Sequence, residues 1–147
     1  MVLNPAQLAT FKADILANQA ANVTAGDIGA IVTYYNSPSA SGTIWRSDIT
    51  TEELNTAIVW ADFAALTVAK QNTYLAMLAP GTIDATNANI RSGFVAVFGS
   101  GTASTINLTA LAQRTPTRFE ALFTSNQISA VYNQNVNTDV VVRALHS

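Results

Sequence analysis

The residues that carry most enzyme and metal chemistry are nearly absent from this sequence. It has one histidine, His146, which is second from the C-terminus, and it has no cysteine. A histidine so close to a chain end is usually solvated. Without cysteine and with one histidine, the commonest transition-metal ligand sets cannot be assembled. We therefore expect no catalytic residue, no metal and no cofactor.

Paired carboxylates are the remaining option for acid–base chemistry. A glycosidase needs two of them facing each other across a cleft, and Asp48 and Glu52 are the pair that could meet. Helix N-capping explains both residues more simply. A small hydrolase that uses these carboxylates is therefore the least favoured of three alternatives. The glycine-rich stretch 99–104 lacks the Gly-Lys-Ser/Thr ending of a phosphate loop, so it predicts an ordinary loop after a helix.

Composition favours a protein that stays in contact with neighbours. Charged residues make up 11% of the 147 residues, against about 25% in a typical soluble protein. The surface must then be built from Ala, Thr, Asn, Ser and Gln, which are weakly hydrated and do not repel one another. A monomer with an unusually uncharged surface is the alternative. The net charge of −2 and the scattered Lys and Arg residues argue against specific nucleic-acid binding, and no apolar run is long enough to span a membrane.

Hydrophobic spacing and capping residues predict an all-α fold. We expect one helical domain over 1–147, a compact bundle of about six to seven short helices, with one short strand or extended arm near the C-terminus as an option. Residues 124–147 could form such an arm. The predicted helices cover 5–18, a segment from Thr24 (with Asp27) to about Asn36, a segment after Thr50 or Thr51 that breaks and restarts at Thr67, a segment from Thr86 or Asn87 to Gly99, a shorter helix within 102–114, and a last one capped by Asn137 or Thr138. Residues 139–145 are β-branched enough to form a strand instead, and 44–45 and 128–132 are predicted to be extended.

The segment 114–123, "RTPTRFEALF", predicts a helix corner. Thr115 would be the N-cap and Pro116 the first residue of a two-turn helix. Arg114 and Arg118 could pair with carboxylates such as Glu120 or Asp62, which would make the corner a structural clamp. A contact with a partner subunit is the alternative.

Trp45 and Arg46 form a second candidate, because they precede a capped helix. Either Arg46 stacks on an aromatic ring or Trp45 docks into a neighbour. The candidate contact residues for subunits or partners are Trp45, Arg46, Arg91, Arg114, Arg118, Glu120 and Phe123.

Five ordered stretches resemble a family of small virion proteins of tailed bacteriophages. They are 43–54 with its Trp-Arg loop, 65–78 with a Leu-Thr then Lys restart, 84–98 with Asn-x-Asn-hydrophobic-Arg, 111–123 with the Arg-Thr-Pro-Thr-Arg-Phe-Glu corner, and 136–145 with a closing Asp-Val-x-x-x-Ala-Leu helix. Thr115 before Pro116 departs from the Pro-Ala order usual in that family. The resemblance implies a structural role at the head–tail junction and supplies no catalytic residue.

We therefore expect a non-enzymatic head–tail connector, adaptor or neck protein that forms a homo-oligomeric ring in the virion and assembles in the bacterial host cytoplasm. Its partners would be phage portal, capsid or tail proteins, with DNA only as passing cargo. The alternative of another class is a capsid cement, decoration or tail-surface protein that binds an existing lattice. Ring formation by the isolated chain would distinguish the two.

Overall fold

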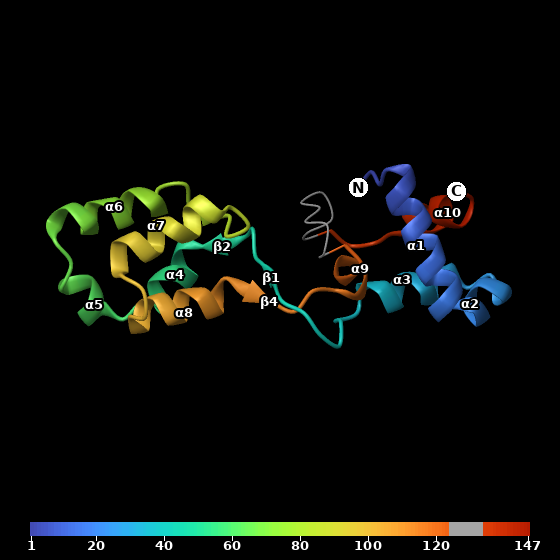
Figure 1. Ribbon diagram of the computed structural model, residues 1–147, viewed down its shortest axis with the longest axis horizontal. Helices are drawn as coiled ribbons and strands as arrows, with labels where there is room; N and C mark the ends of the chain where they lie inside the picture. Colours follow the sequence, from blue (N-terminus) through green and yellow to red (C-terminus); the bar gives the residue numbers. More distant parts are fainter. Residues whose placement is uncertain (124–133) are drawn as a thin grey trace. The chain divides into compact units, whose positions relative to one another are not determined.

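The computed structural model describes residues 1–123 and 134–147. These residues form mostly helices and divide into two compact units, described separately below (Figure 1). Unit 1 comprises 1–43 and 115–147, and unit 2 comprises 44–114. The single-domain organisation expected from the sequence stays a prediction.

The helix count is higher than the six to seven expected. The described residues contain ten helices and two two-stranded sheets. The difference arises because the segments predicted around Thr24 and after Thr50 are each broken by residues that end one helix and start another. The mostly helical class is confirmed.

Unit 1 begins with α1 (Pro5–Asn18), which starts and ends where the sequence predicts. The side-chain oxygen of Asn4 accepts a hydrogen bond from the backbone N–H of Gln7, and the side-chain oxygen of Gln7 accepts one from the backbone N–H of Asn4. Pro5 occupies the first helical position. Two shorter helices, α2 (Ala20–Ala25) and α3 (Ile28–Asn36), follow.

The predicted N-cap at Thr24 is wrong. Thr24 lies inside α2, where its hydroxyl donates to the Ala20 carbonyl. Gly26 then takes a left-handed conformation with φ of 69°, which a residue with a Cβ rarely adopts. Asp27 caps α3 instead, by accepting a hydrogen bond from the Ala30 amide at 2.9 Å.

The C-terminal part of unit 1 contains α9 (Arg118–Ala121) and α10 (Thr138–Leu145). Asn137 caps α10, so residues 139–145 form a helix rather than the alternative strand. Figure 1 shows α10 beside α1. Val140, Val141 and Ala144 of α10 are buried in the same core as Phe11 and Ile15 of α1.

This packing bears on the predicted C-terminal arm. Its described part does not extend away from the fold, since Val136 is buried in the core of unit 1 along with the apolar face of α10. Asn36 fixes the entry to α10 by exchanging two hydrogen bonds of 2.8 Å with the backbone of Val136. The extended segment predicted at 128–132 lies outside the described residues.

Unit 2 contains α4 (Thr51–Ala57), α5 (Trp60–Ala64), α6 (Val68–Leu78), α7 (Ala88–Phe98) and α8 (Ala103–Leu111). Thr50, Thr67 and Asn87 cap α4, α6 and α7, and Gly99 ends α7, as the sequence predicts. The single helix expected before the restart at Thr67 is two helices, because Ile58 and Val59 are extended and the Val59 amide donates to the Ser104 hydroxyl at 2.9 Å.

Four very short strands form two small sheets in unit 2. β1 (Ile44–Trp45) pairs antiparallel with β4 (Gln113–Arg114), and β2 (Ile49–Thr50) pairs antiparallel with β3 (Thr82–Ile83). The extended conformation predicted at 44–45 is confirmed. Ile49 and Ile83 face each other in register and enter a core that also contains Tyr74, Phe94 and Phe98.

Candidate functional site

Arg46 is held by carboxylates of its own unit. Its Nη1 and Nη2 atoms donate to the two oxygens of Glu53 at 2.9 and 3.3 Å, and Nε donates to Asp48 at 3.2 Å. Among the residues that the structure describes, no ring stacks on Arg46, contrary to one expectation. Its side chain is 20% exposed, so this guanidinium fastens the loop before α4 to the helix itself.

Glu53 performs two tasks in this arrangement. It closes the capping box of α4 by accepting from the Thr50 amide at 2.8 Å, and it binds Arg46. The hydrogen bond from Arg46, followed by that from the Thr50 backbone, lowers the pKa of Glu53 to about 2. Glu52 lies in the first turn of α4 as expected, while Asp48 pairs with Arg46 instead of capping the helix.

Trp45 and Arg91 form the cation–aromatic contact of unit 2. The guanidinium carbon of Arg91 lies 4.4 Å from the centroid of the indole ring. Its Nη1 atom also donates to the carbonyls of Ala85 and Thr86, at 2.6 and 2.9 Å. Two predicted contact residues therefore meet each other and fix the start of α7.

The corner at 114–123 differs from its predicted form. Arg114 lies in β4. Pro116 is buried outside any helix, and its carbonyl oxygen accepts a hydrogen bond from the Ser39 amide at 2.9 Å. Thr115 is therefore not the N-cap. Thr117 caps α9 in a capping box with Glu120, and the signal in the sequence was the Thr-x-x-Glu spacing of 117–120.

Arg118 fastens α9 to the end of α3. Its guanidinium carbon lies 4.5 Å from the centroid of the Tyr34 ring, and it donates to the Tyr34 and Ser37 hydroxyls at 3.1 Å each. Glu120 and Phe123 are 1% and 2% exposed. These two predicted partner contacts are therefore buried within unit 1.

A groove between α7 and α8 was not predicted from the sequence. It has a volume of about 370 Å³. Buried residues that line it include Ile49, Leu54, Ile83, Leu108 and Ala112. The less buried lining residues combine small side chains with larger ones: Ala88, Ser92, Thr105 and Thr109 with Trp45, Ile90 and Val95. Arg91 is the charged residue among those that line it. No sequence signal marked it, since the groove depends on how two helices and a sheet are placed.

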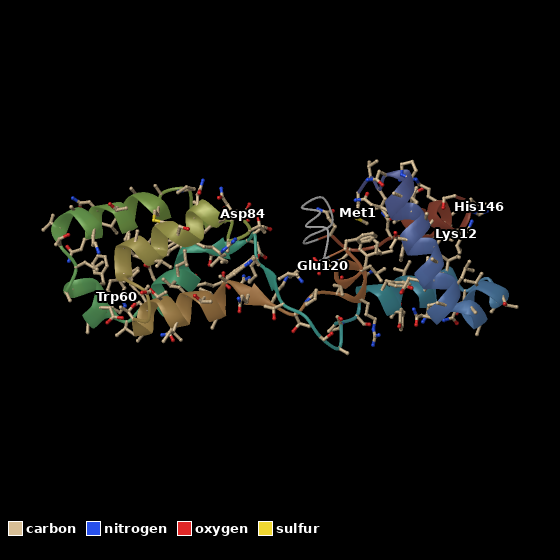
Figure 2. All side chains as sticks on the ribbon, viewed as in Figure 1. Met1, Lys12, Trp60, Asp84, Glu120 and His146 are labelled. Carbon is tan, nitrogen blue, oxygen red and sulfur yellow. The ribbon has the colours of Figure 1, made fainter. Side chains whose placement is uncertain are left out.

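Arrangements typical of metal chemistry do not occur in the described part of the chain. No group of three or more His, Asp or Glu side chains there could hold a metal ion. His146 is exposed and its Nδ1 lies 2.8 Å from the Val142 carbonyl (Figure 2). Nor does any described helix have the length and apolarity that crossing a bilayer requires.

Comparison with known proteins adds no family. No protein-family model, no curated protein and no solved structure matches the chain.

Proposed function

We propose that this chain is a non-enzymatic structural subunit of a tailed-phage virion, which assembles into a ring at the head–tail junction. The observation that carries the proposal is the near absence of charge on three helices of unit 2. Lys70 is the charged residue of α6 and Arg91 that of α7, while α8 has none. Such surfaces are weakly hydrated, and removing them from water in a lasting contact costs little.

Exposed apolar side chains support the same proposal. Val68 and Leu75 on α6 are 71% and 55% exposed, and Ile106 on α8 is 61% exposed. Single exposed apolar residues are ordinary. Here they lie on helices that offer almost no charge to keep monomers apart, which favours assembly.

The residues behind the phage resemblance have a consistent role. In unit 2, the contact between Trp45 and Arg91 links β1 to α7, and the hydrogen bond from Arg46 to Glu53 links the loop after β1 to α4. In unit 1, Thr117 caps α9 and Arg118 binds Ser37. These contacts explain why such motifs would be needed in a rigid building block. Partner contact by the same residues stays a prediction.

The test is to mix the purified protein with phage portal protein and, separately, with emptied phage capsids, and to analyse the bound fractions by native mass spectrometry. Stoichiometric binding to portal is expected for a connector. A chain that ignores portal but coats capsids would instead be a cement protein. Cleavage of cell-wall polymer that is lost in Asp48→Asn would contradict the non-enzymatic role.

A further inference from the structure

We propose that the groove between α7 and α8 receives Trp60 of a second copy of this chain. The inference rests on the proposed ring and names the contact that would build it. It requires a cavity that accepts an aromatic ring and an aromatic ring that is exposed. The two must also lie on separate surfaces, so that each copy can bind one neighbour through its groove and another through its tryptophan.

The groove suits a large apolar side chain. Its floor is apolar and includes Phe94, and the small residues Ala88 and Ser92 leave room at its edge beside the larger Val95. Its volume of about 370 Å³ is at the lower end of the roughly 300–1,000 Å³ of small-molecule sites. Thr105, Ser92 and Thr109 add hydroxyls at the rim but no charge, so a ring that enters the groove would displace water from mainly apolar walls.

Trp60 is the side chain that fits this description. It is 57% exposed and is the largest of the exposed apolar residues in the described chain. Its ring is not loose, because it lies edge-on to Phe63 with centroids 5.5 Å apart, and Phe63 in turn meets Tyr74 at 5.6 Å. A fixed, exposed tryptophan loses little conformational freedom on binding, and tryptophan is the residue type most enriched at interface hot spots.

The charges are complementary. Asp62, two residues after Trp60, is the charged residue of α5 and accepts from the Ser104 amide at 2.9 Å through one oxygen. The groove carries the opposite charge on Arg91, which uses Nη1 for its two carbonyl partners. The carboxylate near the incoming tryptophan is therefore opposite in charge to the charged residue that lines the groove.

The two surfaces are separate, so the contact propagates. Trp60 is not among the residues that line the groove. In Figure 1, α5 lies at the end of unit 2 away from β1 and β4, and Figure 2 labels Trp60 there. When one surface binds a different surface on the next copy, the contact is heterologous and generates a closed ring or a filament. A self-complementary dimer contact would not do this.

Complementation between two variants tests the inference. Trp60→Ala removes the ring, and Ser92→Arg places a charged side chain on the exposed rim of the groove. Each variant alone should be monomeric, with a dissociation constant raised at least about 30-fold, the threshold of a hot spot. Mixed in equal amounts, the two variants should form a heterodimer, because the intact groove of Trp60→Ala accepts Trp60 of Ser92→Arg. The heterodimer should not grow, because its remaining groove is blocked and its remaining tryptophan is missing. Sedimentation velocity measures all three samples.

The controls separate folding, this contact and the ring itself. Leu16→Ser changes an exposed apolar residue of α1, in the other unit, and should leave the oligomer intact. Circular dichroism checks that each variant is folded, and Thr109→Lys on the opposite wall replaces Ser92→Arg if that variant unfolds. A Trp60→Ala chain that assembles like the wild type, or a mixture that stays monomeric, overturns the contact but leaves the ring. A monomeric wild-type chain overturns both.

Discussion

The guanidinium of Arg91 lies 4.4 Å from the centre of the Trp45 ring while it also binds the carbonyls of Ala85 and Thr86. This contact links β1 to the first turn of α7. It combines cation–aromatic attraction with hydrogen bonds that satisfy backbone groups, and it forms one wall of the groove.

Replacing Arg91 by lysine should destabilise the protein although the charge is kept. Lysine has no planar face to lie on the indole, and a single ammonium cannot reproduce both the stacking and the paired carbonyl contacts. We expect a loss of about 1–2 kcal/mol in the free energy of unfolding, measured by urea denaturation. Arg143→Lys is the matched control, because its pairing with Asp139 at 3.9 Å is exposed and should contribute less than about 0.5 kcal/mol. Equal effects of the two substitutions would contradict the assigned role of Arg91.

Glu53 should make the stability depend on acid pH. Its pKa is lowered from an ordinary value of 4.5 to about 2 by Arg46 and Thr50. A carboxyl whose pKa is lower in the folded than in the unfolded chain adds stability above the unfolded pKa. That stability is lost as the pH falls from 4.5 toward 2.

The check is to compare urea midpoints of the wild type and Glu53→Gln at about pH 6 and about pH 2.5. The wild type should be the more stable at the higher pH, and the difference should shrink at the lower one. Added salt should also reduce it, since the pair is partly exposed. A difference that stays constant with pH would show that Glu53 acts only as a neutral cap.

Tyr35 and Tyr74 allow the hydrogen bonds of the two units to be compared. The Tyr35 hydroxyl donates to the Asp14 carboxylate at 2.5 Å, and the Tyr74 hydroxyl donates to the neutral Asn55 side chain at 3.0 Å. Burial, and then the bond to Asp14, raises the pKa of Tyr35; burial raises that of Tyr74 to about 12.

Substitution by phenylalanine keeps each ring and removes only the hydroxyl. We expect Tyr35→Phe to cost about 1.5–3 kcal/mol and Tyr74→Phe about 1 kcal/mol, because a bond to a charged acceptor is the stronger one. Thermal or urea unfolding of both variants measures this. The reverse order would contradict the geometry at Asp14.

Val141 and Val142 are adjacent in α10 and differ in burial. Val141 is 0% exposed and Val142 is 37% exposed. Val141→Ala should cost about 2 kcal/mol through the cavity it leaves in unit 1. Val142→Ala should be neutral or slightly stabilising, because alanine favours helix more than valine does. Similar losses at both positions would contradict the packing of one face of α10 against α1.

Local features of the fold were readable from the sequence because their causes are local. A helix start depends on a cap side chain that accepts a hydrogen bond from a backbone amide about three residues later. The N-caps are at the positions that the sequence predicts for four helices: Asn4, Thr50, Thr67 and Asn137. The wrong N-cap at Thr115 has the same origin: Pro116 favoured a helix start at that point, whereas the capping box of Thr117 with Glu120 starts the helix two residues later.

Long-range features could not be obtained this way. Unit 1 is made from both ends of the chain, and the contact of Asn36 with Val136 joins residues 100 positions apart. Side-chain periodicity does not say which helices pair. For the same reason Glu120 and Phe123 were predicted to be surface contacts although both are buried, and the groove was not predicted.

The central claim is that this chain is a ring-forming subunit, and native mass spectrometry of the purified wild-type chain tests it most directly. We expect one discrete closed oligomer that persists on dilution, with no ladder of intermediate sizes, since a closed ring has no free end. A clean monomer at every concentration would contradict the claim, and would leave the uncharged helices as the surface of a solitary protein.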